Sequence, residues 1–149
     1  MKIRDVMTTD PVCCLPEDTA QKAAQVLRDN NVGSVPVVSD HQSRKLVGMI
    51  TDRDLCLSIV AEGLNPRSTA IEKYISVKPI ACRDGENLEH CARAMQQHQV
   101  RRIPIVDGAG QCIGIVSQAD LALKFKPEKV SQTVAEISKP EAERTSIAS

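Results

Sequence analysis

The chain has 149 residues, of which 42% are hydrophobic and 26% charged, as is typical of one ordinary globular domain or two small ones. Lys plus Arg and Asp plus Glu both number 19, so no overall basic charge favours nucleic acid. One Tyr, one Phe and no Trp leave almost nothing to stack on bases. We therefore expect no nucleic-acid partner.

No apolar run approaches the roughly 20 residues that a membrane helix needs. The basic residues near Met1 are not followed by a long apolar stretch, so the N-terminus does not resemble a secretory signal. These features predict a cytoplasmic protein without a membrane partner.

The six cysteines do not indicate disulfides when no export signal accompanies them. Cys56, Cys91 and Cys112 fall where the helix and strand patterns require an apolar side chain. There is no Cys-x-x-Cys, and the three histidines complete no recognisable zinc spacing, so we expect no metal site. A redox role for the adjacent Cys13 and Cys14 remains an alternative.

Each of two parts of the chain, 3–55 and 71–121, contains the same series of predicted elements. A short strand candidate, 12–14 or 80–82, follows a proline that blocks helix formation. A helix then begins after Thr19 or Asn87 and continues for about three turns. Its predicted apolar face comprises Ala20, Ala23, Ala24 and Leu27 in the first copy and Leu88, Cys91, Ala92 and Met95 in the second.

Two short strands and a second helix complete each copy. The strands are predicted at 34–38 and 46–50, joined by a polar loop, and at 102–106 and 112–116. Pro36 and Pro104 lack a backbone donor, so we expect them at an edge or a bulge. The second helix is predicted over 51–61 and over 117–125.

The order β-α-β-β-α predicts an α/β (α+β) fold whose repeats span about 55 residues each. Such a repeat is too small for an adequate core of its own, so the two repeats should pack together. The predicted organisation is a first domain over 1–62, a linker over 63–70, a second domain over 71–125, and a C-terminal helix with a frayed tail over 126–149.

The end of each repeat carries the chemistry. Thr51 and Ser117 are predicted helix N-caps, with Asp54 and Asp120 three residues later. Unpaired N–H groups at a helix start suit a phosphate, and the nearby Asp suits a ribose diol. The same pattern is also a capping box, which needs no ligand.

The Val-Pro-Val-Val strand, the Gly-x-Ile-Thr/Ser-x-x-Asp-Leu ending and the duplication resemble a tandem pair of CBS domains, known as a Bateman module. The resemblance covers about residues 1–125 and is strongest to small stand-alone bacterial two-CBS proteins, through 51–54, 61–66, 98–102 and the C-terminal tail. It implies two repeats packed with pseudo-two-fold symmetry, acting as a regulatory binding module and not as an enzyme.

The resemblance also implies two related clefts that hold an adenosine-type ligand: AMP or ATP first, with ADP, NAD and S-adenosylmethionine as further candidates. The Asp contacts ribose, the hydroxyl residue and basic residues contact phosphate, and strand backbone holds adenine, with no required cofactor, no catalytic residue and no metal. For the first cleft the implied residues are Asp120, Ser117, Ile115, Arg101 and Arg102, with Lys2, Met7, Val32 and Gly33. For the second they are Asp54, Thr51 and Met49, with Ala70, Ile75 and Val100 opposite.

The two implied clefts differ in charge. Arg101 and Arg102 stand where the first repeat has Gly33 and Ser34. Because an Arg fork can bind phosphate through two donors, we expect the Asp120 cleft to be the better site. The alternative is that the two arginines form a solvated strand end or a dimer contact.

The resemblance further implies a homodimer, with Leu55, Leu57, Ile59 and Val60 as candidate contacts, although the same residues could belong to the intramolecular core. A competing hypothesis is a ligand-free interaction protein that docks an unknown client and uses the repeated motif only to cap helices. Gly-x-Ser-x-Gly, a Walker-type loop and His-Glu-x-x-His are all absent from the sequence, so no motif supports an enzyme.

Overall fold

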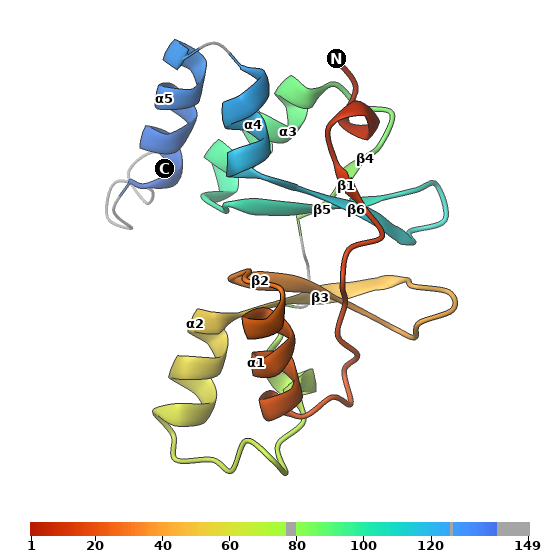
Figure 1. Cartoon of the computed structure of the whole chain (residues 1–149), viewed down its shortest axis with the longest axis vertical. Helices are drawn as coiled ribbons and strands as arrows, with labels where there is room; N and C mark the ends of the chain where they lie inside the picture. The colour runs from red at the N-terminus through yellow and green to blue at the C-terminus, as the bar shows by residue number, and fades with distance from the viewer. Residues whose placement is uncertain (77–79, 126, 140–149) are drawn as a thin grey trace. The chain divides into compact units, whose positions relative to one another are not determined.

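The computed structural model describes residues 1–76, 80–125 and 127–139 (Figure 1). The strands are β1 (Thr8–Thr9), β2 (Ser34–Val38), β3 (Leu46–Thr51), β4 (Cys82–Arg83), β5 (Arg102–Val106) and β6 (Cys112–Ser117). The helices are α1 (Ala20–Asp29), α2 (Asp52–Leu55), α3 (Leu88–His98), α4 (Gln118–Lys124) and α5 (Pro127–Ile137), with short turns η1 (Ile3–Asp5), η2 (Cys56–Val60, a π-helix) and η3 (Ile71–Tyr74).

These elements form two compact units. Unit 1 comprises Met1–Thr8, Ile80–Ile105 and the described residues from Gly114 onward, and unit 2 comprises the described residues from Thr9 to Ser76 with Val106–Ile113. Each repeat lends a segment to the unit built mainly from the other. In unit 1 the Ile3 N–H donates to the Glu86 carbonyl at 2.9 Å, and in unit 2 the Ile71 N–H donates to the Asp18 carbonyl at 3.0 Å.

Unit 1 is built on a four-stranded sheet with the order β1-β6-β5-β4. Figure 1 shows α3, α4 and α5 on one side of this sheet. The predicted apolar face of α3 is confirmed, because Leu88, Cys91, Ala92 and Met95 are all buried. Gln96 of α3 donates to the buried Thr133 hydroxyl at 2.8 Å, which fixes α5 against α3. The C-terminal helix is therefore present, while the predicted tail from 140 lies outside the described residues.

Unit 2 contains the antiparallel pair β2–β3, which pairs Ser34 with Thr51. Single bridges extend the pair, from Cys14 to Val37 on one side and from Met49 to Ser76 on the other. Figure 1 shows α1 and α2 on one side of this sheet. The two units thus repeat one arrangement of strands and helices.

Pro36 shows how a proline is accommodated inside a paired strand. The prediction was an edge or a bulge: β2 has β3 on one side and Cys14 on the other, so Pro36 is not at an outer edge, but a register shift lies one residue further on, between Val37 and Val38. The Pro36 carbonyl accepts the Cys14 N–H at 3.0 Å, and Val38 donates back to the Cys14 carbonyl at 2.9 Å. In this pairing Pro36 contributes only its carbonyl and Val38 contributes the N–H, so the missing N–H of Pro36 is not needed.

Two predictions about burial were wrong, at Ala24 and Cys56. Ala24 of α1 is exposed, so the buried face consists of Ala20, Ala23 and Leu27, with the half-buried Val26 packed beside them. Cys56 is exposed, although the pattern required an apolar side chain there. The four candidate dimer residues are divided: Leu55 and Ile59 are buried in the core of unit 2, while Leu57 and Val60 are 50% and 72% exposed.

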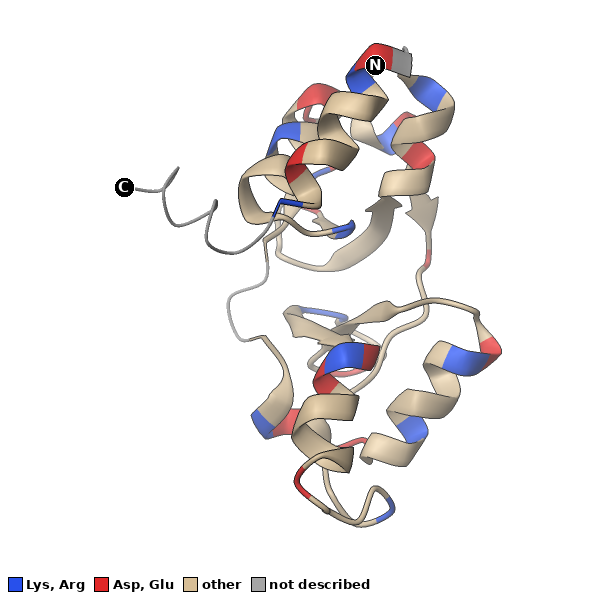
Figure 2. Cartoon of the chain, turned by 90° about the vertical axis from the view of Figure 1, so that its left-hand side faces the viewer, with Lys and Arg blue, Asp and Glu red and all other residues tan. Residues whose placement is uncertain are grey.

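Charge is interspersed along the helices of both units, with acidic and basic residues on the same elements (Figure 2). Among the described residues, none of the helices has the length and apolar character needed to cross a membrane.

Candidate functional site

The repeated motif forms a closed capping box at the start of α4 in unit 1. Ser117 is the last residue of β6, and its hydroxyl accepts the Asp120 N–H at 3.2 Å. In return, Oδ2 of Asp120 accepts the Ser117 N–H at 2.8 Å. These reciprocal bonds hold both side chains at the point where the strand turns into the helix.

The start of α2 in unit 2 has the same geometry. The Thr51 hydroxyl accepts the Asp54 N–H at 2.9 Å, and Oδ2 of Asp54 accepts the Thr51 N–H at 3.0 Å. The prediction that both hydroxyl residues act as N-caps is therefore confirmed.

The capping bonds leave part of each acid available. A carboxylate has two oxygens with about four acceptor positions, and each box uses one oxygen. Within the described part of the chain, Oδ1 of Asp54 and Oδ1 of Asp120 accept no hydrogen bond. Both acids are half-buried, so one oxygen braces the helix and the other can still accept a ligand hydroxyl.

Backbone bonds attach the start of the preceding strand to each box. In unit 1 the Gln118 N–H donates to the Arg101 carbonyl at 2.8 Å, and in unit 2 the Asp52 N–H donates to the Gly33 carbonyl at 2.9 Å. The backbone frames match, but the side chains on them differ.

The charged residues near the two capping boxes differ. In unit 1 the Arg101 carbonyl accepts the N–H of the uncharged Gln118, two residues before Asp120; Arg101 is exposed and the next residue, Arg102, is half-buried. In unit 2 the place of the arginines is taken by uncharged residues, and Asp52 adds a second carboxylate beside Asp54 with only Arg53 to balance them. The residues joined to the start of α4 therefore carry more positive charge than those at the start of α2.

The remaining residues of the predicted clefts are divided between the two units and differ in how far they are buried. In unit 1, Ile115 is half-buried in β6, Lys2 is exposed, and the Met7 side chain lies against Gly114. In unit 2, Met49 is half-buried, Ala70 is exposed, and Ile75 is buried in the core. Val32 and Gly33 belong to unit 2 and Val100 to unit 1, so their place beside an acid of the other unit stays a prediction.

The two glycines of the motif allow a neighbouring segment to approach each strand. A Cβ at Gly48 would overlap the Ser76 carbonyl oxygen, and a Cβ at Gly114 would lie 2.5 Å from the Met7 sulfur and 3.1 Å from the Thr8 carbonyl oxygen. These contacts hold the segments before β4 and after η1 against the strands that end in the capping boxes.

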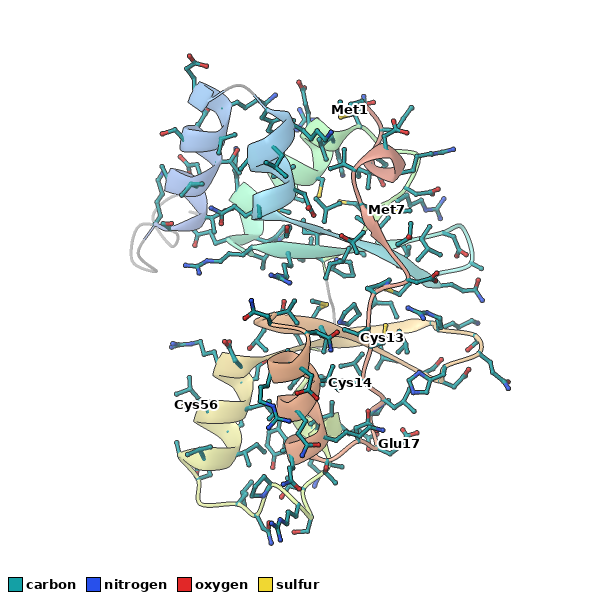
Figure 3. All side chains as sticks on the ribbon, viewed as in Figure 1. Met1, Met7, Cys13, Cys14, Glu17 and Cys56 are labelled. Atoms are coloured by element: carbon teal, nitrogen blue, oxygen red, sulfur yellow. The ribbon has the colours of Figure 1, made fainter. Side chains whose placement is uncertain are left out.

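Cys13 has a different environment from its neighbour Cys14 (Figure 3). The Arg44 guanidinium donates to the Cys13 sulfur at 3.3 Å. A hydrogen bond from the Cys112 thiol, and then the Arg44 charge, lower the pKa of Cys13 against the opposing effect of burial. Burial, with the nearby Asp18 charge, raises the pKa of Cys14 to about 11. The reactive thiol of the pair is therefore Cys13.

Sequence reasoning did not identify one group of side chains. Cys82, Glu86 and His90 place a sulfur, a carboxylate oxygen and a ring nitrogen within 4.8 Å of one another. The spacing Cys-x-x-x-Glu-x-x-x-His was visible, but it crosses a strand, a turn and a helix start, so helical or strand periodicity alone could not bring the three together.

Comparison with known proteins identifies the repeats. The family model of the CBS domain matches residues 3–61 and 71–126. The CBS domain-containing protein YhcV of Bacillus subtilis is 37% identical over 121 residues, which cover 81% of this chain and 83% of YhcV. Hypoxic response protein 1 of Mycobacterium tuberculosis is 32% identical over 140 residues, which cover 93% of this chain and 95% of that protein.

Solved structures share the fold. A crystal structure of hypoxic response protein I with two coordinated zinc ions has a TM-score of 0.75 and 28% identity, covering 85% of this chain and 100% of that one. The CBS domain pair of protein MJ0100, in complex with 5′-methylthioadenosine and S-adenosyl-L-methionine, has a TM-score of 0.73 and 25% identity, covering 83% of this chain and 94% of that one.

Proposed function

The chain belongs to the CBS-domain family as a tandem pair of such domains, and on that premise we propose that it is a regulatory module that binds an adenosine-type ligand beside Ser117 and Asp120. The observation that supports this proposal is the bond from the Gln118 N–H to the Arg101 carbonyl, which joins the backbone at Arg101 to the start of α4. The resulting site combines a free carboxylate oxygen with two guanidinium groups.

Each group has a role that follows from its chemistry. Oδ1 of Asp120 accepts hydrogen bonds from the ribose hydroxyls while Oδ2 keeps its bond to the Ser117 N–H. Arg101 and Arg102 bind phosphate through paired N–H donors. The Ser117 oxygen accepts the Asp120 N–H, so its hydroxyl proton remains available for a phosphate oxygen.

The arginines also favour one group of adenosine compounds over another. The MJ0100 pair was crystallised with two sulfur-containing adenosine compounds, which supports the adenosine class. Neither of those compounds carries a phosphate, and a pair of exposed or half-exposed arginines is best used by one that does. We therefore place AMP and ATP ahead of S-adenosylmethionine and 5′-methylthioadenosine for this chain.

Thermal unfolding in the presence of each ligand tests the class. AMP, ADP, ATP, NAD, S-adenosylmethionine and 5′-methylthioadenosine are each added to the purified protein, and calorimetric titration follows for those that shift the midpoint. A ligand at ten times its dissociation constant stabilises the folded state by about 1.4 kcal/mol. If none of the six shifts the midpoint, the proposed function is wrong.

Matched variants test the location. Asp120→Asn and Asp54→Asn each keep an oxygen that can accept the capping N–H, so both should fold, and only the first should weaken ligand binding. Arg101→Gln should weaken ATP more than 5′-methylthioadenosine, because only ATP presents phosphate. Equal weakening by Asp54→Asn and Asp120→Asn would contradict the preference for unit 1.

The closed capping boxes favour a second candidate, a ligand-free interaction protein with a client protein as its partner. Both acids already have a structural partner within the chain. In that case the motif only caps helices, and Asp120→Asn would reduce stability without changing any ligand titration. We propose no catalytic role for any residue in either case.

We also propose that the protein is a cytoplasmic homodimer. Leu57 and Val60 are exposed on the same short helical segment of unit 2, and both are large and apolar. Sedimentation of wild type and of Leu57→Glu/Val60→Glu tests this, since the double variant should be monomeric if the segment forms the interface. An unchanged sedimentation coefficient would exclude this segment.

A further inference from the structure

The start of unit 1's helix α3 gathers three chemically different donors outside the proposed ligand site. Cys82 Sγ, a Glu86 carboxylate oxygen and a His90 ring nitrogen all lie within 4.8 Å of one another. Cys82 is buried, while the Glu86 and His90 side chains are 34% and 55% exposed. The group is therefore anchored at one end and open to solvent at the other.

The local fold fixes these donors without help from a ligand. β4 ends at Arg83, and the turn that follows is closed by the Glu86 N–H, which donates to the Arg83 carbonyl at 3.1 Å. Oε1 of Glu86 accepts the Arg83 N–H at 3.0 Å. The other oxygen, Oε2, lies 2.9 Å from Nε2 of His90 in the first turn of α3. Cys82 precedes the turn by one residue, so strand, turn and helix start each supply one donor.

The first repeat has the same backbone arrangement with a different side chain in place of the histidine. Cys14, Asp18 and Lys22 occupy the equivalent positions. Oδ2 of Asp18 accepts the Leu15 N–H at 2.8 Å, as Glu86 accepts the Arg83 N–H, and Nζ of Lys22 lies 3.3 Å from Oδ1 of Asp18. The first repeat therefore supplies its own cation, the lysine ammonium, at the position where the second has a histidine.

Histidine at this position changes the chemistry of the group. Lys presents an ammonium with no lone pair, whereas a neutral imidazole presents a lone pair that can bind a metal ion. A thiolate, a carboxylate and an imidazole are the three side-chain donors that Zn²⁺ uses in proteins. With three protein donors, a tetrahedral ion has a fourth position for water.

We propose that Cys82, Glu86 and His90 bind a Zn²⁺ ion at the start of α3. A tetrahedral zinc with bonds of about 2.0–2.3 Å holds its donors about 3.3–3.8 Å apart, so a spacing near the 4.8 Å limit must shrink by about 1 Å, and Glu86 Oε2 and His90 Nε2, now 2.9 Å apart, must separate slightly. Glu86 and His90 are partly exposed and can make that adjustment by side-chain rotation. The Glu86 bond to the Arg83 N–H would orient the carboxylate from behind the metal.

Zinc titration of matched variants tests the site. The protein is stripped with a chelator, kept reduced with a phosphine that does not bind metals, and titrated with Zn²⁺ against a chromogenic competitor. His90→Lys reproduces the residue that the first repeat already accommodates, so it should fold, and Cys82→Ser removes the sulfur. His98→Lys makes the same change at the exposed far end of α3 and is the control.

Wild type and His98→Lys should bind one equivalent, and His90→Lys and Cys82→Ser should each lose affinity by more than about 100-fold. Co²⁺ should give a thiolate charge-transfer band in wild type that is absent from Cys82→Ser. The proposal is overturned if wild type binds no zinc, if His90→Lys binds as tightly as wild type, or if His98→Lys loses as much affinity as His90→Lys.

Discussion

Gly48→Ala should destabilise the protein because the added methyl meets backbone. The new Cβ would overlap the Ser76 carbonyl oxygen and lie 3.3 Å from Cδ1 of Ile75. Ser76 cannot retreat without losing the bond from its N–H to the Met49 carbonyl, at 3.1 Å. Overpacking costs about 1–3 kcal/mol, and a lost backbone hydrogen bond about 1 kcal/mol more. The lower entropy of the unfolded alanine chain offsets about 0.4–1 kcal/mol.

The expected net loss in the free energy of unfolding is therefore about 1–3.5 kcal/mol, with a central value of about 2 kcal/mol. Gly114→Ala is the internal comparison: its Cβ meets the Met7 sulfur and Cγ at 2.5 and 3.0 Å, which can move aside, and lies 3.1 Å from the Thr8 carbonyl oxygen without overlapping it. For Gly114→Ala we expect a loss of about 1 kcal/mol in the free energy of unfolding. Gly108→Ala has nothing within 4 Å and is the control for the alanine effect itself.

Urea unfolding of the three variants, followed by circular dichroism, gives the midpoint and the slope for each. A Gly48→Ala protein as stable as wild type would show that the strand and the Ser76 segment do not approach as described. Equal losses for Gly48→Ala and Gly114→Ala would show that contact with backbone is no costlier here than contact with a flexible side chain.

Three further predictions concern single side chains. Thr51→Ala should cost about 0.5–2 kcal/mol of stability in urea unfolding, and Thr51→Ser, which keeps the capping oxygen, should cost less than half as much. Arg44→Gln should slow alkylation of Cys13 by iodoacetamide, followed by peptide mass spectrometry, while the exposed Cys56 reacts at an unchanged rate. A Cys13 rate unaffected by this change would mean that Arg44 does not activate the thiol. Folding raises the pKa of Cys14 to about 11 from its ordinary value of 9.0, so stability should fall as pH rises from 9 towards 11. Cys14→Ala should flatten that fall, and an equally steep loss in the variant would refute the assignment.

Local patterns predicted the elements of this fold well where one face of a helix meets one core. All four apolar residues expected on α3 are buried, because α3 packs on the sheet and on α5. Ala24 was wrongly predicted to lie on the apolar face of α1 and is exposed. Alanine is small enough to occur on either side of a helix, so its position in the pattern did not decide whether it is buried. Both capping boxes were predicted because their bonds are local.

What sequence reasoning missed depends on contacts between distant segments. The Ile3–Glu86 and Ile71–Asp18 backbone bonds join residues far apart in the chain, and no periodicity encodes them. The Cys82 group was missed for a related reason: its three donors come from three kinds of backbone conformation, which only the folded turn before α3 brings together.

The two repeats share the same backbone hydrogen bond beside the capping box but carry different side chains there. Exchanging those side chains between the units tests whether they decide which repeat binds ligand. Gly33 and Asp52 stand in unit 2 where Arg101 and Gln118 stand in unit 1, and the two backbone bonds agree within 0.1 Å, at 2.9 and 2.8 Å. A Cβ at Gly33 would lie 3.5 Å from Oδ2 of Asp52, an ordinary contact, so Gly33→Arg is sterically acceptable.

Alone, that arginine would pair with the Asp52 carboxylate and remain unavailable to phosphate. Gly33→Arg/Asp52→Gln removes the competitor and gives unit 2 the counterparts of Arg101 and Gln118 beside Asp54. If charge next to a capping box decides which repeat binds, calorimetric titration with ATP should change from one site in wild type to two in the double variant. Gly33→Arg alone should stay at one site. If the double variant still binds one equivalent of ATP, the charge beside the capping box is not what distinguishes the two repeats.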